Sequence, residues 1–404
     1  MEGAARRTLW LLSVCQFLMS SVLWAFAPIL PVDLAAMQGA PASPAALSLW
    51  SGAILGANFL AAAVMAPVWG RLTDRIGPKW MLIRAGVAET VFTALMAFAN
   101  APWQLLLLRI GLGLFAGYAV AATAWVSLTT PRHKVGLAMG VLSAGQSAGI
   151  TVAPLLGELF WAWSHQVATS LLAIAGLAAL ALGWTVLGIP QVPPRPAAES
   201  LWSRPEGLKP YRALVFVALV AQAALTAVVP VATTWTAHLQ GTSLEEAVGG
   251  AAAALAITGV VGALCAPLAG RAIDAVGSRR VLLLAFLGAA GCLGVQALTT
   301  RYAVFLGARA LLGLFTSAIF PSVNATVARM TRRQERGAAY GLTTGGIFFG
   351  NATGPVVGGI LAGTLGVQGL LASAALWLGV LGVFSWFAWA PTERAGQAMG
   401  SALR

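Results

Sequence analysis

Ionisable residues are scarce in this sequence. Asp, Glu, Lys and Arg together make up 9% of its 404 residues, whereas apolar residues make up 59%, and the mean hydropathy is +0.83. Soluble globular domains carry charge on about a quarter of their residues. The scarcity of charge therefore excludes an ordinary soluble protein.

Cysteine and histidine are also rare, with three residues of each kind. Cys15, Cys265 and Cys292 fall within apolar stretches and have neither metal-ligand nor disulfide spacing, so we expect small packing residues. The sequence contains no HExxH motif, no Walker loop and no GxSxG motif with catalytic partners. It therefore predicts a protein that is not an enzyme and that has no metal site and no cofactor.

Long apolar runs recur along the whole chain. Each is long enough to cross ~30 Å of hydrocarbon as a helix, and the ten-residue alternation of a membrane β-barrel is absent. The sequence predicts an all-α membrane protein with twelve transmembrane helices. They are expected at about residues 8–31, 48–70, 80–99, 103–127, 137–162, 166–189, 213–237, 247–270, 280–299, 303–327, 337–362 and 368–390.

Basic residues give the chain a net charge of +12, and they gather on one side of this topology. When the helices alternate in direction, nearly all basic residues fall in loops on one side. Arg301 lies in a loop on the other side, and Arg109 and Arg309 lie within helices. The positive-inside rule then predicts that both termini are cytoplasmic, and the distribution argues against nucleic acid as a partner. The first apolar run is too long for a cleaved signal peptide.

The chain repeats itself after 200 residues. The run GRLTDRIGPK at Gly70 reappears as GRAIDAVGSR at Gly270, and RIGLGLF at Arg109 reappears as RALLGLF at Arg309. With one extra residue, a third motif also aligns, pairing Gly140, Gly149, Pro154 and Gly157 with Gly341, Gly350, Pro355 and Gly358. The repeat predicts two parallel six-helix bundles, residues 1–190 and 212–404, joined by a Pro-rich cytoplasmic linker at 191–211.

These motifs resemble those of the major facilitator superfamily over essentially the whole chain. Its signature between helices 2 and 3 is matched by Gly70, Leu72, Asp74, Arg75, Gly77 and Lys79, while Thr73 and Pro78 depart from it. Arg109 with Gly113 resembles its fourth-helix motif. Its fifth-helix "antiporter" motif is reproduced in helix 11 by Gly341, Gly350, Gly354, Pro355, Gly358 and Gly359, while in helix 5 Ala153 and Glu158 replace glycines. The runs LSLWSGAI and MLIRAGV are similar to bacterial multidrug:proton antiporters of the MdtG type.

The resemblance implies a cytoplasmic gate. In the family, the aspartate of the first signature meets the start of helix 11, which lies here near residues 335–339. We expect Asp74 to act as a latch there, because a carboxylate is stabilised at a helix N-terminus, and Asp274 to meet helix 5 near Gly136 by the repeat. The basic residues also serve as topology signals. The predicted gate motif comprises Gly70, Arg71, Asp74, Arg75, Gly77, Lys79, Gly270, Arg271, Asp274 and Gly277.

Ionisable residues within the membrane cost about 2.5–3.5 kcal/mol on insertion scales and are functional candidates. Arg109 and Glu158 fall at similar depths and are expected to pair, either structurally or in coupling, whereas Arg309 is expected to bond backbone carbonyls. Glu89, in the middle of helix 3, is either a proton carrier or a neutral acid bonded to a neighbouring helix. Asp33 is either interfacial or at the cavity mouth. The proton-coupling candidates are therefore Glu158, Glu89, Asp33 and Arg109.

A substrate cavity is implied between the two bundles. Each candidate lining residue alone is more often a packing or interface residue. As a set they describe an apolar, aromatic vestibule that suits amphipathic or cationic organic compounds. The candidates are Trp24, Asn58, Tyr118, Trp125, Gln146, Gln222, Trp235, Asn324, Phe348 and Asn351.

The sequence thus predicts a proton-coupled exporter of small amphipathic or drug-like compounds, working by alternating access. The alternative is a symporter or uniporter for a small metabolite such as a sugar or organic acid, and a non-transporting sensor on the same fold would normally carry a soluble output domain. We expect a monomer in the bacterial inner membrane, whose partners are its small-molecule substrate, protons and the lipid bilayer.

Overall fold

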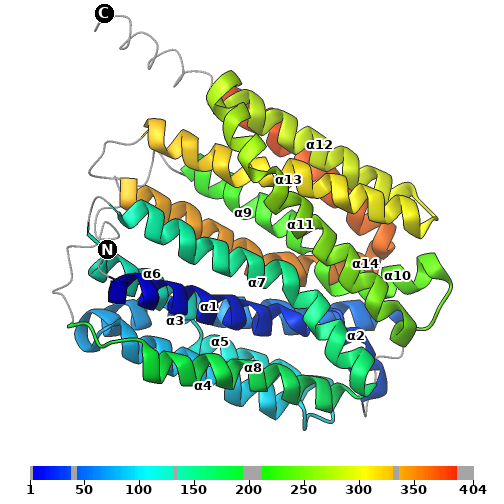
Figure 1. Cartoon of the computed structure of the whole chain (residues 1–404). Helices are drawn as coiled ribbons and strands as arrows, with labels where there is room; N and C mark the ends of the chain where they lie inside the picture. The colour runs from blue at the N-terminus through cyan, green and yellow to red at the C-terminus, as the bar shows by residue number, and fades with distance from the viewer. Residues whose placement is uncertain (1–2, 38–42, 132–133, 194–211, 331–335, 389–404) are drawn as a thin grey trace, which may run out of the picture.

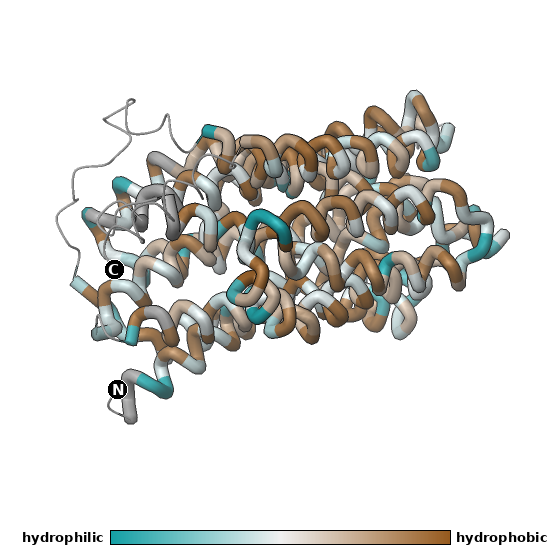
Figure 2. Tube along the Cα trace, turned by 90° about the horizontal axis from the view of Figure 1, so that it is seen from above, coloured by the Kyte–Doolittle hydropathy of each residue, from teal (hydrophilic) through white to brown (hydrophobic). Residues whose placement is uncertain are grey.

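The computed structural model describes residues 3–37, 43–131, 134–193, 212–330 and 336–388 of the chain. All regular secondary structure in these ranges is helical. The helices lie side by side along a common direction (Figure 1). Large apolar side chains such as Trp163, Leu187 and Leu298 face outward, and apolar residues run along the lengths of the helices (Figure 2). An apolar outer surface of this kind is what a bilayer-embedded bundle presents to lipid.

The first half of the chain forms eight helical segments and the second half forms seven in the described ranges. In order they are α1 (Gly3–Ala25), α2 (Leu30–Ala36), α3 (Pro44–Ile76), α4 (Pro78–Met96), α5 (Pro102–Phe115), α6 (Tyr118–Thr129), α7 (Val135–Ser164), α8 (Val167–Gly188), α9 (Arg212–Thr226), the 3₁₀ helix η3 (Val229–Val231), α10 (Ala232–Gln240), α11 (Leu244–Val276), α12 (Ser278–Leu298), α13 (Tyr302–Met330) and α14 (Arg336–Ala388).

Every predicted span overlaps one helix or a broken pair. The predicted fourth span is α5 and α6, separated at Gly117 with φ 121°, and the predicted seventh is α9, η3 and α10. The last two predicted spans lie in α14, which Gly366 breaks with φ 73° and ψ 172°. By length and composition, ten described helical stretches can cross a membrane. The helix α4 is not among them, because three charged residues lie within its 19 residues. The helix α14 counts as one stretch, although it contains two predicted spans.

The repeat in the sequence recurs as a repeat of contacts. Gly77 and Gly277 both have φ 90° and both end a helix of 33 residues. Lys79 Nζ donates to the Val186 carbonyl oxygen at 2.9 Å, at the end of α8. Its counterpart Arg279 donates through Nε to the Trp386 carbonyl oxygen at 2.8 Å, at the end of α14. In both halves a basic residue at the start of the third span therefore binds the end of the sixth.

Three apolar clusters form the core. One lies within α1–α8 and includes Met19 and Trp125, and a second lies within α9–α14 and includes Phe286 and Phe305. The third joins Ile29 in the first half to Val248 in the second. Cys15 and Cys292 are buried and Cys265 is half-buried, and all three are free thiols, which agrees with the packing role predicted for them. The third cluster marks the end of the molecule at which the halves meet.

Candidate functional site

The two halves close against each other at one end of the bundle, which we name the closed end. It comprises α2, η3, α10 and the starts of α3 and α11. Thr233 Oγ1 donates to the Pro28 carbonyl oxygen at 2.7 Å across the halves, and Val248 packs with Ile29 and Leu30 in the third apolar cluster. The closed end is therefore sealed by apolar contacts and by a hydrogen bond between the halves.

Glycines bring α3 and α14 into backbone contact near the closed end. A Cβ at Gly359 would lie 2.6 Å from the Ser48 carbonyl oxygen, and one at Gly363 would lie 3.2 Å from the Ala45 carbonyl oxygen. A Cβ at Gly52 would collide with the Pro355 carbonyl oxygen. Such close approach of two helices requires small residues. The α3–α14 contact is thus a tight seam between the halves.

The remaining glycines of the helix 11 motif serve a different contact. Gly350 and Gly354 leave room for the Leu219 and Ala223 carbonyl oxygens of α9, each 2.6 Å from where a Cβ would lie, and Gly358 contacts Ala227. Gly341 has open space around it. One face of α14 therefore packs within its own half, while Gly359 faces the other half.

The opposite end, at the Gly77 and Gly277 turns, is open between the halves. A Cβ at Gly70 or Gly270 would meet nothing within 4 Å, and the same holds for Gly140 and Gly345. At Gly77, by contrast, a Cβ would lie 2.8 Å from the Val192 carbonyl oxygen, and the positive φ also favours glycine. The Gly77 turn thus packs closely within its own half, while the other glycines named here contact no described residue of the other half.

The predicted latch lies outside what the structure describes. The side chain of Asp74 is not among the described ones, nor are those of residues 336–340 at the start of α14, nor that of Gly136. Arg71, Arg75, Arg271 and Asp274 are exposed. The latch remains a prediction, and it concerns a conformation in which this end closes.

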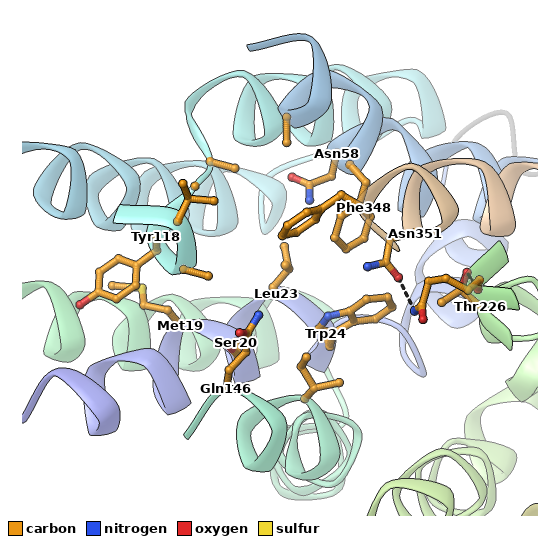
Figure 3. A pocket seen from close by; sticks show the side chains of 18 of the residues that line it. Met19, Ser20, Leu23, Trp24, Asn58, Tyr118, Gln146, Thr226, Phe348 and Asn351 are labelled. Carbon is orange, nitrogen blue, oxygen red and sulfur yellow. Dashed lines mark hydrogen bonds between the residues drawn. The ribbon is translucent and has the colours of Figure 1, made fainter. Parts of the chain in front are cut away.

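A cavity of about 560 Å³ lies between the halves. It extends to Gly70 and Thr73 near the end of α3, and so it reaches toward the open end. Seven of the ten predicted cavity residues line it: Trp24, Asn58, Tyr118, Gln146, Gln222, Phe348 and Asn351. Figure 3 shows the cavity with Trp24, Asn58 and Tyr118 among the labelled residues. Its volume falls within the range of small-molecule sites.

Three predicted cavity residues do not line it. Trp125 is buried in the first half, and its Nε1 donates to the Pro190 carbonyl oxygen at 3.0 Å. Trp235 is buried and stacks on His238 with ring centroids 5.2 Å apart. Asn324 is exposed on α13. The assignment of these three to the cavity was wrong, because the rotation of each helix about its axis turns them elsewhere.

Aromatic rings and amide groups dominate the cavity wall. The Trp24 and Phe59 rings lie 5.3 Å apart. Gln222 Nε2 donates to Asn351 Oδ1 at 2.7 Å, joining α9 to α14 (Figure 3). Asn58 Oδ1 is buried without a partner among the described residues. The wall thus offers π-faces for an apolar body together with amide groups for polar contacts.

Sequence reasoning missed several lining residues, including Gln16, Ser20 and Thr226. It also missed the side-chain contacts that bridge the break between α5 and α6. There Trp69 Nε1 donates to the Leu114 carbonyl oxygen at 2.7 Å, and Arg84 Nη2 donates to the Ala116 carbonyl oxygen at 2.8 Å. The Arg84 guanidinium stacks on Trp69, 3.7 Å from the ring centre. These groups satisfy carbonyls that a helix break leaves without partners.

Arg109 and Glu158 do not form the predicted pair. Arg109 is 3% exposed; its Nη1 lies 3.5 Å from the Leu23 carbonyl oxygen, and its guanidinium lies 5.3 Å from the Phe26 ring centre. Glu158 instead faces α11, where a Cβ at Gly249 would lie 3.5 Å from its Oε1. The pairing was wrong because α7 turns Glu158 toward the other half. The repeat aligns Glu158 with Gly359, which lies in the corresponding contact between α3 and α14.

Asp33 lies at the closed end, between the candidate spans Arg6–Ala25 and Pro44–Ala66. It is 9% exposed, and its Oδ2 has no partner among the described residues. Burial raises the pKa of Asp33 from 3.8 to about 7. The ionisable side chains on the elements packed nearest are Glu245 and Glu246, which are exposed in the first turn of α11.

This burial makes the closed end sensitive to pH. Opening would return Asp33 to water and its pKa toward 3.8, so the closed form binds the extra proton. The contribution of Asp33 to the stability of the closed form is therefore fully present below about pH 4 and is lost as the pH rises through about 7. It amounts to about 4 kcal/mol at ~1.4 kcal/mol per pKa unit.

Among the described side chains, two charged ones lie in the cavity wall itself, those of Glu89 and Arg309. Arg309 Nε donates to the Ala254 carbonyl oxygen at 3.2 Å, which confirms the backbone bond predicted for it. Glu89 is 6% exposed, and its Oε2 has no partner among the described residues. No group of three or more metal-ligating side chains occurs in the described part of the chain.

Comparison with known proteins agrees with this architecture. A family model described as Major Facilitator Superfamily matches residues 9–265 and 214–401. Multidrug resistance protein MdtG of Klebsiella pneumoniae (strain 342) is 30% identical over 331 residues, covering 80% of this chain and 79% of that protein. MdtG of Enterobacter lignolyticus (strain SCF1) is 29% identical over 339 residues, covering 82% and 80%.

Solved structures share the fold at low sequence identity. A bacterial homologue of the human lysosomal transporter Spinster, in an inward-facing and occupied conformation, superposes with a TM-score of 0.77 at 13% identity, covering 96% of this chain and 97% of that one. The nucleoside transporter NupG also gives 0.77, at 14% identity, covering 96% and 100%. The match of the family model across both halves, together with the MdtG relatives, shows that the chain belongs to the major facilitator superfamily and is a multi-pass membrane transporter, not an enzyme.

Proposed function

We propose that this protein is a proton-coupled exporter of small amphipathic compounds in the bacterial inner membrane, with both termini cytoplasmic. The observation that carries the proposal is a cavity of about 560 Å³, lined by aromatic and amide side chains, with an unpartnered acid in its wall. The names of the MdtG relatives support drug efflux. The basic loops support the orientation, in which the open end faces the cytoplasm.

Alternating access follows from the asymmetry between the two ends. The halves, residues 1–190 and 212–404, are sealed at one end by the α3–α14 seam and by the bond from Thr233 to Pro28. Rocking of one half against the other would break this seal and close the opposite end. In that second conformation Asp74 would latch onto the start of α14, and Glu158 and Asp33 would be released from their contacts at the closed end.

Glu89 is the best placed of the proton-coupling candidates, because it is the acid in the cavity wall. A proton and a substrate group that compete for one carboxylate exchange with each other across the cycle. Glu158 and Asp33 lie at the closed end instead, where they would exchange protons with the other side of the membrane. Arg109, buried against Phe26, is placed to support α5.

The test uses everted membrane vesicles, a fluorescent reporter of the proton gradient, and a panel of amphipathic cations, anions, zwitterions and neutral drugs. Export coupled to protons predicts that a substrate dissipates the gradient, that Glu89→Gln abolishes this response, and that Glu245→Gln, an exposed acid, preserves it. Substrate movement without proton flow would indicate a uniporter. Movement of substrate in the same direction as protons would indicate a symporter for a metabolite.

A further inference from the structure

The cavity wall carries one negative and one positive residue, and they come from opposite halves. Glu89 lies on α4 in the first half, and Arg309 lies on α13 in the second. Among the lining residues whose side chains the structure describes, they are the charged ones. No ion pair joins them in the described structure. The cavity therefore has two separate poles of opposite sign.

Both residues have side-chain polar atoms that form no hydrogen bond with a described residue. Glu89 is 6% exposed, with Oε2 buried and unpartnered among the described residues. Arg309 is 5% exposed and uses Nε for the Ala254 carbonyl oxygen, while its two Nη groups donate to no described residue. Ionisable groups without partners at membrane depth are costly and are candidates for a functional site. A ligand that supplies both counter-charges would relieve both costs.

The repeat shows that the position of Arg309 is particular to its half. Its counterpart Arg109 does not line the cavity, and it lies against Phe26 and the Leu23 carbonyl oxygen instead. Arg309 lies on α13 and bonds Ala254 on α11. The same two helices also place Thr316 and Thr258 in the cavity wall. The second half thus presents a guanidinium to the cavity at a position where its counterpart in the first half does not.

Glu89 and Arg309 stand at the same depth. Glu89 lies seven residues before the end of α4 at Met96, and Arg309 lies seven residues after the start of α13 at Tyr302. Both of these helix ends lie at the closed end, and at 1.5 Å per residue both charges are about 10 Å below it. The cavity wall also carries aromatic rings, including Trp24 and Phe59. Glu89 and Arg309 thus line one cavity, whose wall also carries these rings.

We propose that the cavity selects amphipathic zwitterions, with Glu89 binding an ammonium group and Arg309 binding a carboxylate or another anionic group. The guanidinium suits such a group because its fork can donate two parallel hydrogen bonds to it. This selectivity rests on the proposed function only in that the cavity is the transport site. A net-neutral ligand also leaves the summed charge of the occupied cavity unchanged.

The experiment measures dissociation constants for the purified full-length protein by calorimetry. The probes are two matched sets: octylamine, octanoate and 8-aminooctanoate, and phenethylamine, 3-phenylpropionate and phenylalanine. Together they place the two charges far apart or adjacent on similar apolar bodies. At least one zwitterion should bind tenfold or more tightly than both singly charged members of its set. Equal or weaker binding of both zwitterions would overturn the proposal.

Substitutions test which residue binds which charge of the zwitterion. Glu89→Gln should remove the preference of the zwitterion over its matched anion, and Arg309→Gln should remove its preference over the matched cation. Glu245→Gln and Arg301→Gln, both at exposed positions, should change neither. Arg309→Lys, which keeps the charge without the fork, should lower the zwitterion's affinity severalfold and serves if Arg309→Gln does not fold. An unchanged preference in the Glu89 or Arg309 variants would refute the assignment.

The outcome separates this inference from the proposed function. If substrate-driven proton release occurs in vesicles but zwitterions bind no better than cations, export stands and zwitterion selectivity falls. If zwitterions bind preferentially through both residues but no proton moves, selectivity stands and proton coupling falls.

Discussion

Gly359→Ala should open the closed end. A Cβ at this position would lie 2.6 Å from the Ser48 carbonyl oxygen of the other half, whereas ordinary contact begins at 3.4 Å. The two helices must therefore separate by about 0.8 Å at this point, and overpacking of this kind costs ~1–3 kcal/mol. Because ~1.4 kcal/mol is a tenfold change in an equilibrium constant, the ratio of closed to open forms should fall by roughly 5- to 150-fold.

Distances between two spin labels report this equilibrium. Labels at Ala35 on α2 and Thr242 before α11 sit at exposed positions in opposite halves. Gly359→Ala should shift their distance distribution toward longer values. Gly363→Ala, with 3.2 Å to the Ala45 carbonyl oxygen, should shift it less, and Gly345→Ala, with open space around it, should not shift it.

The graded series makes the reasoning refutable. An unchanged distribution in a correctly folded Gly359→Ala protein would show that the α3–α14 seam does not hold this end closed. An equal shift in Gly345→Ala would show that any substitution in α14 perturbs the distribution, and steric contact at the seam would then not be the cause.

Three further predictions address charged groups. Raising the pH from about 5 to 8 should lengthen the distance between the same labels, because Asp33 ionises more readily when this end opens; Asp33→Asn should be insensitive over this range, and an unaltered pH response would exclude Asp33 as its origin. Asp74→Asn should keep the native melting temperature and impair transport, so normal turnover in vesicles would discard the latch. Arg279→Met should lower stability by about 1–3 kcal/mol, since its charged bonds to the Trp386 carbonyl oxygen at the end of α14 are lost. Arg279 also stacks on the Trp386 ring, 3.9 Å from its centre, whereas Lys79 makes one bond. Lys79→Met should therefore lower the melting temperature less, and equal losses would argue against this account.

Much of the fold could be predicted from the sequence because its signals are local or repeated. Apolar length placed every span on a helix, and the glycine turns at Gly77 and Gly277 stand where the repeat put them. The break at Gly366 lies in the gap predicted between the spans 337–362 and 368–390, whereas the break at Gly117 was missed within the span 103–127. An apolar run continues through a break whose carbonyls find partners in other helices.

The candidate site could be predicted only in part. Trp24 and Asn58 line the cavity as predicted, but Trp125 and Trp235 do not. In a soluble helix the polar face reveals which side is buried. In a membrane helix nearly all faces are apolar, so the sequence carries little information on the rotation of each helix about its axis.

The sequence by itself determined that this chain is a helical membrane protein built of two repeats. Its apolar runs are long enough for spanning helices and lack the alternation of a barrel strand, and its motifs recur after 200 residues. Tertiary structure alone decided that Glu158 faces α11 and not Arg109, and that Arg309 lines the cavity while its counterpart Arg109 does not. The physical reason is that glycine-to-carbonyl packing between helices sets their rotation. That rotation decides which of two equivalent side chains can meet a substrate.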